Sequence, residues 1–357
     1  MVLVATPSLI KVAELKHLVD EPSGGRKTHT RRIPTIGGII IFAATIFAYA
    51  LWFPWDNPEY FGGIYEFSHS VKEFKFLIAA SILIFFIGVK DDIIGVAPAK
   101  KLITHVIVGF ILVLMADIRI SGLHGVFGIQ EIPYWSSVLL SIFTYIVVVN
   151  AFNLIDGSDG LAAGIGAIAT CFFGGWFLAT QQMDLALISF VLTGALGAFL
   201  LFNFSPARIF MGDSGALFIG AVIFALSVKC IETSAVRLEG LGAVKTISAP
   251  IFAMSVLAYP LIDTLRVFTL RILKGSSPFA ADRNHIHHKL LDNGYSHTRT
   301  AIFLYLISLV IPFISFLFEG VNYSITFFAM LAISALVVHA PFFVVAVRKP
   351  SRLAHST

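Results

Sequence analysis

Long apolar stretches recur along the whole chain and are separated by short polar segments. Their residues show little alternation between an apolar and a polar face, which is typical of helices that face lipid or other helices rather than water. A helix that crosses a membrane needs roughly 20 apolar residues. The pattern predicts ten such helices, near residues 36–54, 75–90, 102–118, 134–152, 161–180, 185–203, 214–231, 247–272, 301–318 and 324–347. We therefore expect an all-α fold, a polytopic transmembrane helix bundle of about ten spans.

The composition agrees with this expectation. Of the 357 residues, 57% are hydrophobic and only 13% are charged, whereas about 25% of the residues in an ordinary soluble domain are charged. These values exclude a soluble globular enzyme, a disordered chain and a disulfide-rich scaffold. The two cysteines, Cys171 and Cys230, lie in apolar stretches and cannot form a cysteine-rich metal site.

Basic residues are distributed unevenly between the two sides of the predicted bundle. Ten spans place both termini on one side, and 17 of the 25 Lys and Arg residues fall on that side. Six fall on the other side, and Arg266 and Arg271 lie within the eighth span. Because Lys and Arg are enriched in cytoplasmic loops, we expect both termini to be cytoplasmic.

The spans divide the chain into three parts. Residues 1–35 form a cytoplasmic N-terminal segment, in which Met1–Ile10 is too short to cross a bilayer and predicts a short interfacial helix. Residues 36–347 form the transmembrane domain, and residues 348–357 form a cytoplasmic tail. Four polar loops fall on the cytoplasmic side, at 91–101, 150–161, 203–213 and 273–300.

Carboxylates gather in these loops. Asp91 and Asp92 end the second span, Asp156 and Asp159 follow the fourth, and Asp213 precedes the seventh. Acids at the membrane are costly and usually functional. Two adjacent carboxylates push their pKa values apart, which suits a base beside an orienting charge. The alternatives are a solvated helix end for the first pair, and a helix N-cap for Asp213 or for Ser214 beside it.

The loop after the fourth span has a regular polar spacing. Asn150, Asn153 and Asp156 are three residues apart, which places them on one helix face, and Gly157 and Gly160 end that helix. At the seventh span, a helix N-terminus attracts phosphate and Asp213 suits a hard cation. Oxygen ligands without thiols favour Mg²⁺, with Mn²⁺ as the alternative, over zinc.

Three histidines lie close together in the longest loop. Positions 285, 287 and 288 do not share one helix face and have no cysteine nearby, so a zinc site is disfavoured. With Arg283 beside them, His285, His287 and His288 indicate a group that binds phosphate. A divalent cation and a phosphate-binding group at the membrane surface favour phosphoryl transfer between a soluble nucleotide compound and a lipid phosphate.

Five motifs in series resemble those of the polyprenyl-phosphate N-acetylhexosamine-1-phosphate transferase superfamily, glycosyltransferase family 4. They are Arg26-Lys27-x-His29 with Pro34-x-x-Gly37-Gly38, Asp91-Asp92-x-x-Gly95, Asn150-x-x-Asn153-x-x-Asp156-Gly-x-Asp159-Gly, Phe210-Met-Gly-Asp213-Ser-Gly, and Pro278-Phe-x-x-Asp282-Arg283-x-His285-x-His287-His288. They extend from about residue 20 to residue 300. The last motif lacks the Pro-x-His-His-His form of the phospho-N-acetylmuramoyl-pentapeptide branch. It resembles the branch that moves N-acetylglucosamine 1-phosphate.

The chain departs from this family in two places. The family normally begins with a full spanning helix, which gives eleven spans in this branch. Met1–Ile10 is expected to be the remnant of that helix, through either a misplaced start or a truncation. His105 stands where the branch is expected to carry Gln.

The resemblance implies a reaction. Undecaprenyl phosphate attacks the β-phosphorus of a UDP-N-acetylhexosamine, by default UDP-N-acetylglucosamine, and UMP is released. Such a Mg²⁺-dependent enzyme of the bacterial inner membrane would begin a cell-surface polysaccharide such as O-antigen, with its active site facing the cytoplasm. Its partners are the two substrates and the lipid bilayer, with no nucleic acid; a homodimer is left open.

The resemblance also implies roles for individual residues. The metal ligands are Asp213 and Asn153, and the catalytic acids are Asp91, Asp92, Asp156 and Asp159. The first two would orient or deprotonate the lipid phosphate, and the other two would stabilise the site and hold substrate or metal. The substrate-binding residues are Asn150, Asn203, Phe210, Arg283, His285, His287, His288 and Lys101. Among them, Phe210 would stack on uracil and Lys101 would steer the lipid headgroup.

Three other functions compete with this one. A phospho-N-acetylmuramoyl-pentapeptide-like transferase shares most of the motifs. A transporter or channel needs polar groups at mid-bilayer and on both faces, whereas here only Asp263 is a candidate for mid-bilayer and the periplasmic loops lack a matching cluster. A CDP-alcohol phosphotransferase carries a single Asp-Gly-x-x-Ala-Arg segment, which this sequence lacks.

Overall fold

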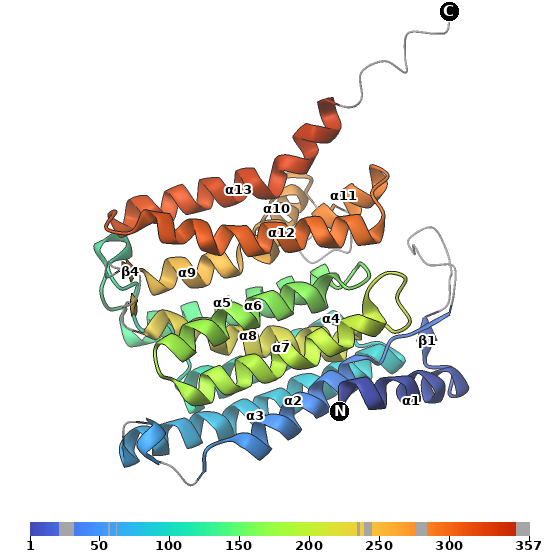
Figure 1. The fold of residues 1–357 in the computed structure, drawn as a ribbon, viewed down its shortest axis with the longest axis horizontal. Helices are drawn as coiled ribbons and strands as arrows, with labels where there is room; N and C mark the ends of the chain where they lie inside the picture. The colour runs from blue at the N-terminus through green and yellow to red at the C-terminus, as the bar shows by residue number, and fades with distance from the viewer. Residues whose placement is uncertain are drawn as a thin grey trace, which may run out of the picture.

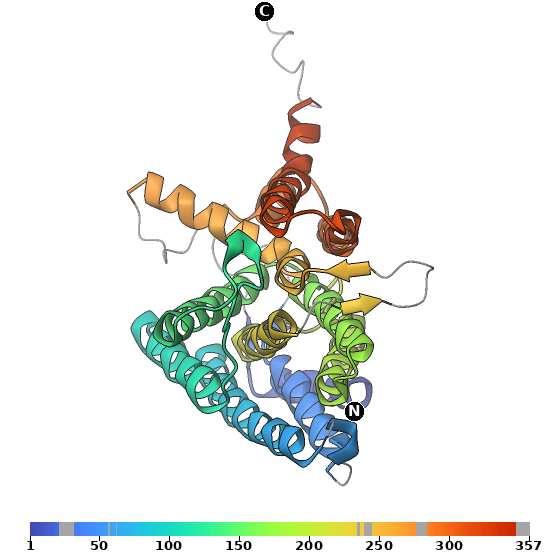
Figure 2. The ribbon, with the colours of Figure 1, turned by 90° about the vertical axis from the view of Figure 1, so that its left-hand side faces the viewer.

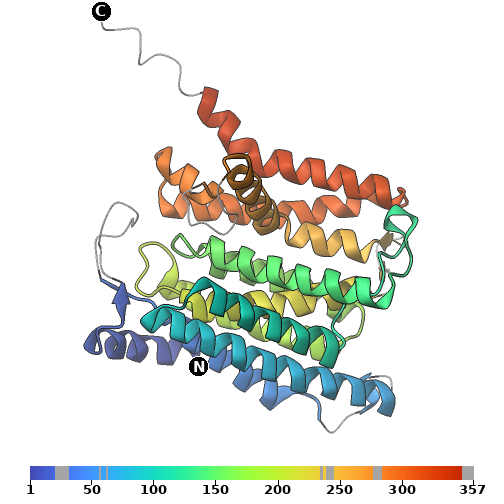
Figure 3. The ribbon, with the colours of Figure 1, turned by 180° about the vertical axis from the view of Figure 1, so that it is seen from behind.

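The computed structural model describes residues 1–20, 32–55, 58–61, 63–233, 236–238, 245–275 and 284–347. In these residues most of the long helices lie side by side along a common direction (Figures 1 and 3). The α-helices are α1 (Val2–Leu15), α2 (Gly38–Trp52), α3 (Ile64–Ile94), α4 (Pro98–Phe110), α5 (Tyr134–Ile155), α6 (Leu161–Ala179), α7 (Met183–Asn203), α8 (Gly212–Glu232), α9 (Ala249–Val256), α10 (Ala258–Leu273), α11 (Ile286–Asp292), α12 (His297–Ser315) and α13 (Tyr323–Val347).

Short elements connect or extend these helices. They are η1 (Pro58–Phe61), η2 (Ile111–Met115, which continues α4), η3 (Val126–Gly128), η4 (Phe316–Phe318), and the strands β1 (Val19–Asp20), β2 (Ile33–Pro34), β3 (Val236–Leu238) and β4 (Lys245–Ile247). The strands form two antiparallel pairs, in which Val19 is opposite Pro34 and Val236 is opposite Ile247.

All ten predicted apolar stretches coincide with a helix or a pair of helices. In the described part of the chain, seven helices are long and apolar enough to cross a membrane, or eight if α9 and α10 form one span. Helix α2 is apolar but has only 15 residues, and the apolar part of α3 is flanked by Lys75 and Lys90. The all-α, polytopic class is confirmed, whereas the count of ten spans and the cytoplasmic side of both termini stay predictions.

The eighth predicted span, 247–272, is wrong as a single continuous helix. Helices α9 and α10 meet at Leu257 with a bend of 70°. Pro260 explains the break, because a proline has no N–H to donate and its ring clashes with the carbonyl group four residues earlier, here that of Val256. Helix α10 consequently projects outward from the bundle (Figure 2).

The first helix is longer than its apolar part predicts. Helix α1 contains 14 residues, Val2–Leu15, and packs against α2 and α7. A helix at Met1–Ile10 is therefore confirmed, and its position at the membrane interface stays a prediction.

Helix α8 is the axis of the bundle. Viewed along the helices, it lies inside a ring formed by the other elements (Figure 2), and it contacts α2, α3, α5, α6 and α9. In an apolar stretch of 18 residues of α8, 89% of the residues are buried, against 67% or less in the corresponding stretches of the other six candidate spans. The position of α8 therefore depends on side chains and backbones all around it.

Glycines let two neighbouring helices approach the start of α8 at backbone distance. A Cβ atom on Gly88 of α3 would lie 2.5 Å from Cα of Ser214, and one on Gly38 of α2 would collide with the backbone nitrogen of Gly215. Because real Cβ atoms do not approach other atoms so closely, a larger residue at either position would displace α8.

We predict that Gly88→Ala destabilises the protein by about 1–3 kcal/mol, the usual cost of overpacking a core. Gly175→Ala on α6 is the matched control, since its added Cβ would meet no atom within 4 Å. The measurement is thermal unfolding of the detergent-solubilised protein. Equal unfolding temperatures for the two variants would contradict this account of how α8 is positioned.

Candidate active site

The beginning of α8 is held by a carboxylate from another helix. Asp92, at the end of α3, accepts hydrogen bonds from the backbone N–H groups of Asp213 (2.7 Å) and Ser214 (3.0 Å). A helix leaves its first N–H groups without partners inside the helix. Asp92 therefore caps α8, and the alternative in which Asp213 or Ser214 is the side-chain cap is wrong. Gly212 precedes this turn with a φ of +73°, in the left-handed region that glycine readily adopts.

The side chain of Asp213 is thereby directed toward α4 and α5. It accepts a hydrogen bond from Nδ2 of Asn153 at 2.7 Å and pairs with Nζ of Lys101. The same Nζ lies 3.1 Å from the carboxylate of Asp91, whose other oxygen accepts the N–H of Val96 at 2.6 Å. One ammonium group is therefore shared by two carboxylates from different helices, with an amide beside them.

The carboxylates raise the local negative charge. Burial, opposed by hydrogen bonds and supplemented by the charge of Asp213, raises the pKa of Asp92 to about 6. Burial also raises the pKa of Asp156 well above its usual value, with the charges of Asp213 and Asp92 adding to the effect. Among the described residues, Lys101 forms ion pairs with Asp91 and Asp213, and the carboxylates of Asp92 and Asp156 lie close to that of Asp213. The arrangement therefore favours binding of additional positive charge.

The histidine run lies over the turn that follows α5. The carboxylate of Asp263, fully buried in α10, accepts the N–H of Ile286 at 2.9 Å and lies 3.0 Å from Nδ1 of His285. His287 is buried, and burial lowers its pKa, with the neighbouring His288 and His285 adding to the effect. Its ring lies against Gly157, where a Cβ would be only 2.7 Å from Nε2 of His287. Asp263 thus fixes the run beside Asp156.

These groups meet around a cavity of about 550 Å³. The predicted site residues that line it are Asp91, Lys101, Asn150, Asn153, Asp156, His285 and His288. Asp213 and Asp92 lie directly behind this lining, through the contacts above, while Arg283 lies outside the described residues. The connections α3–α4, α5–α6 and α7–α8 and helix α11 are at the same end of the bundle (Figure 1).

The cavity also contains two residues that sequence reasoning did not assign to the site, Arg271 and His105. Both are buried. Their positions in the sequence could have identified them as site residues, because a charged or titratable side chain within an apolar stretch is usually functional. From the sequence, Arg271 entered only the count of basic residues on the two sides of the membrane.

Three predicted residues lie away from the cavity and organise the loop between α7 and α8. Asp159 accepts the N–H of Ala207 at 3.1 Å, and the amide of Asn203 donates to the carbonyl of Ile209 at 2.8 Å. The backbone N–H of Phe210 donates to the carbonyl of Pro34 at 2.7 Å. These contacts position the loop that leads to Asp213, and the roles predicted for these residues toward substrate stay predictions.

The cluster has the chemistry of a hard-cation site. In the described residues, no group of three or more His, Cys, Asp or Glu side chains is arranged to hold a metal ion. Two carboxylates, Asp91 and Asp213, and the amide of Asn153 do converge, with Lys101 between the two carboxylates. Carboxylate and amide oxygens are the donors that Mg²⁺ takes in proteins, usually with one or two carboxylates and substrate phosphates, so the donor set fits this ion.

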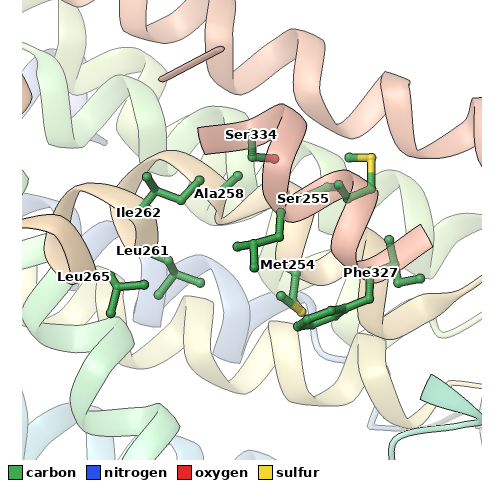
Figure 4. A pocket seen from close by; sticks show the side chains of 11 residues that line it. Met254, Ser255, Ala258, Leu261, Ile262, Leu265, Phe327 and Ser334 are labelled. Atoms are coloured by element: carbon green, nitrogen blue, oxygen red, sulfur yellow. The ribbon is translucent and has the colours of Figure 1, made fainter. Parts of the chain in front are cut away.

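Other cavities in the described part of the chain have a different character. The cleft between α9, α10 and α13 is lined by apolar side chains with Ser255 and Ser334 as its polar members (Figure 4). A cavity of about 520 Å³ between α6, α9 and α12 is similarly apolar. Neither of them is lined by a carboxylate, histidine, lysine or arginine side chain.

The fold and the site define an integral membrane protein of the helical class with an acidic, histidine-containing site at one end of its bundle. Residues 74–231 match the family described as Glycosyl transferase family 4. The chain is 32% identical over 293 residues to the decaprenyl-phosphate N-acetylglucosaminephosphotransferase of Mycolicibacterium smegmatis, covering 79% of this chain and 70% of that protein. It is 27% identical over 320 residues to the undecaprenyl-phosphate alpha-N-acetylglucosaminyl 1-phosphate transferase of Yersinia pestis, covering 88% and 80%.

A probable undecaprenyl-phosphate N-acetylglucosaminyl 1-phosphate transferase of Bacillus subtilis is 29% identical over 310 residues, covering 87% of this chain and 79% of that protein. The chain therefore belongs to glycosyl transferase family 4, in the branch of polyprenyl-phosphate N-acetylglucosamine-1-phosphate transferases. The superfamily and branch predicted from the five motifs are confirmed.

The raised pKa of Asp92 predicts a pH-dependent contribution to stability. A carboxyl group in an unfolded chain has a pKa of about 3.9, and the value here is about 6. Because the folded state binds this proton more tightly, the group stabilises the fold as pH falls from 6 to 4 and destabilises it as pH rises through that range. In EDTA, the unfolding temperature of the wild type relative to Asp92→Asn should therefore decrease between pH 4 and pH 7. A difference that is constant over this range would contradict the assignment.

Proposed function

We propose that this protein transfers N-acetylglucosamine 1-phosphate from UDP-N-acetylglucosamine to undecaprenyl phosphate and releases UMP. The observation that carries the proposal is the cavity at one end of the bundle, where Lys101 joins Asp91 to Asp213 beside the histidine run. This cavity brings together side chains that can bind a cation and side chains that can bind phosphates, in a membrane protein. The relatives described above are named for transfer of N-acetylglucosamine phosphate to polyprenyl phosphates.

In the proposed reaction, an oxygen of the acceptor phosphate forms a bond to the β-phosphorus of the UDP-sugar. The bond from that phosphorus to the bridging oxygen breaks, and the electron pair leaves with UMP. One phosphoanhydride replaces another, so the step is close to thermoneutral. Catalysis then depends on positioning and on neutralising phosphate charge.

The residues divide this work. Asp213 and Asn153 would hold Mg²⁺, which when bound neutralises charge on the diphosphate. Lys101 adds a fixed positive charge next to them, and His285 and His288, which line the same cavity, bind donor phosphate or sugar. The acceptor phosphate is largely ionised at neutral pH, since its second pKa is about 6. Asp91 and Asp92 therefore position the site, and a strong base is not needed.

The setting follows from the same proposal. The active site faces the cytoplasm of a bacterium, where the nucleotide sugar is soluble, and the lipid acceptor reaches it from the inner membrane. The product, undecaprenyl-diphospho-N-acetylglucosamine, is the first lipid-linked intermediate of a cell-surface polysaccharide.

We predict that the purified protein in detergent releases UMP only when UDP-N-acetylglucosamine, undecaprenyl phosphate and Mg²⁺ or Mn²⁺ are all present. The measurement is coupled UMP detection together with extraction of radiolabelled lipid product. CDP-diacylglycerol and UDP-N-acetylmuramoyl-pentapeptide serve as competing donors. Turnover of either of these in place of UDP-N-acetylglucosamine would contradict the proposal.

We further predict that Asp213→Asn lowers kcat at least about 100-fold, the scale on which removal of one charge-stabilising group acts. The variant should also need more Mg²⁺ for half-maximal protection against thermal unfolding in the presence of UDP-N-acetylglucosamine. Asp117→Asn is the matched control, because Asp117 is half-exposed, pairs with Arg119 and lies outside the cavity. Wild-type turnover by Asp213→Asn would exclude Asp213 as a metal ligand.

A further inference from the structure

His105 of α4 is a buried titratable side chain that the proposed mechanism does not use. It is only 2% exposed and lines the cavity. Neither of its ring nitrogens has a hydrogen-bond partner among the residues that the structure describes. Buried side-chain polar atoms nearly always have such a partner, so an imidazole left unpaired against a cavity points to a group that enters the cavity.

The other polar side chains of this wall already have partners. Lys101 pairs with Asp91 and Asp213, Asn150 donates to the carbonyl of Ile146, and His285 contacts Asp263. Within the described part of the chain, both ring nitrogens of His105 are without a partner, so this imidazole can donate a hydrogen bond to a group that enters the cavity.

The depth of His105 indicates which substrate it meets. It lies four residues beyond Lys101 on the same face of α4, about 6 Å further along the helix at 1.5 Å per residue. Because α4 begins at the end of the bundle that carries the site, His105 lies further toward the bundle interior. Leu102, Leu154 and Phe268 are among the apolar residues that also line this cavity.

Helix α4 is also at the periphery of the bundle. It forms part of the outer ring (Figure 2), and on its outer flank Ile103 is 59% and Ile107 is 49% exposed. Exposed apolar side chains on a membrane helix face lipid. The wall that contains His105 therefore separates the cavity from the bilayer, from which a lipid-linked phosphate arrives, whereas a soluble nucleotide sugar enters from the aqueous end.

We propose that His105 binds the phosphate of the lipid acceptor, by donating a ring N–H to a phosphate oxygen next to the ammonium group of Lys101. This inference rests on the proposed function for the identity of the acceptor. It assigns His105 a binding role only, with no bond formed or broken at the imidazole. Both substrates carry phosphates, so the experiment must separate acceptor from donor.

The test compares His105→Leu, which removes the donor, with His105→Gln, which retains an N–H donor. His105→Leu should raise the KM for undecaprenyl phosphate about tenfold or more, the range expected for loss of a hydrogen bond to a charged group, and leave the KM for UDP-N-acetylglucosamine within about twofold. His105→Gln should recover most of the affinity for the acceptor. Tyr145→Phe is the matched control, because it removes a buried, unpaired hydroxyl beside His105 that does not line the cavity.

A second measurement does not depend on turnover. Titration with undecaprenyl phosphate alone, followed by thermal unfolding, should give a Kd about tenfold weaker for His105→Leu than for the wild type or for Tyr145→Phe. Acceptor binding without UMP release would overturn the proposed reaction and leave the role of His105 standing. Unchanged acceptor affinity in His105→Leu, an increase confined to the KM of the nucleotide sugar, or equal increases for both substrates would overturn the role of His105.

Discussion

The contact between Asp92 and the first amides of α8 is the constraint on which the rest of the site depends. The first N–H groups of a helix have no acceptor within the helix, and a carboxylate from α3 accepts two of them here. Close backbone packing at Gly38 and Gly88 brings the helices near enough for this contact. Since α8 is surrounded on all sides, its position along the bundle is fixed by this interaction. The side chain of Asp213, the second residue of α8, is therefore held in a fixed position as well.

The electrostatics of the site follow from this arrangement. Holding Asp213 near Asp91, Asp92 and Asp156 concentrates negative charge, which Lys101 offsets only in part. Burial is the main cause of the raised pKa values of Asp92 and Asp156, and the charges of neighbouring carboxylates add to it. In the proposed function, a divalent cation would relieve the repulsion between these carboxylates and would in turn bind the phosphates of the substrates. The histidine run, which lies beside Asp156, is positioned by a separate carboxylate, Asp263.

The class of the fold and most of the polar residues around the cavity could be predicted from the sequence, because both have local signals. Long apolar stretches predict spans, and loops on one side of a membrane must meet at one end of the bundle. Partners across the fold could not be identified from the sequence. The cap of α8 comes from a residue 121 positions earlier, and Asp263 binds His285 from another helix. Asp159 and Asn203 belong to recognisable motifs, yet they hold a loop together, a role that their spacing does not reveal. The bend between α9 and α10 has a local cause, Pro260, but the apolar pattern continues through this residue and so predicts a single span.

The central position of α8 also constrains how the protein assembles. Translation proceeds from the N-terminus, and domains generally form in that order. Of the helices that contact α8, all except α9 are synthesised before it. The helices that surround α8 must therefore leave an opening until α8 is inserted between them. That opening lies on the side that α9 later covers. Insertion of α8 completes the acidic half of the site, and the histidine half joins only when the last third of the chain has entered the membrane.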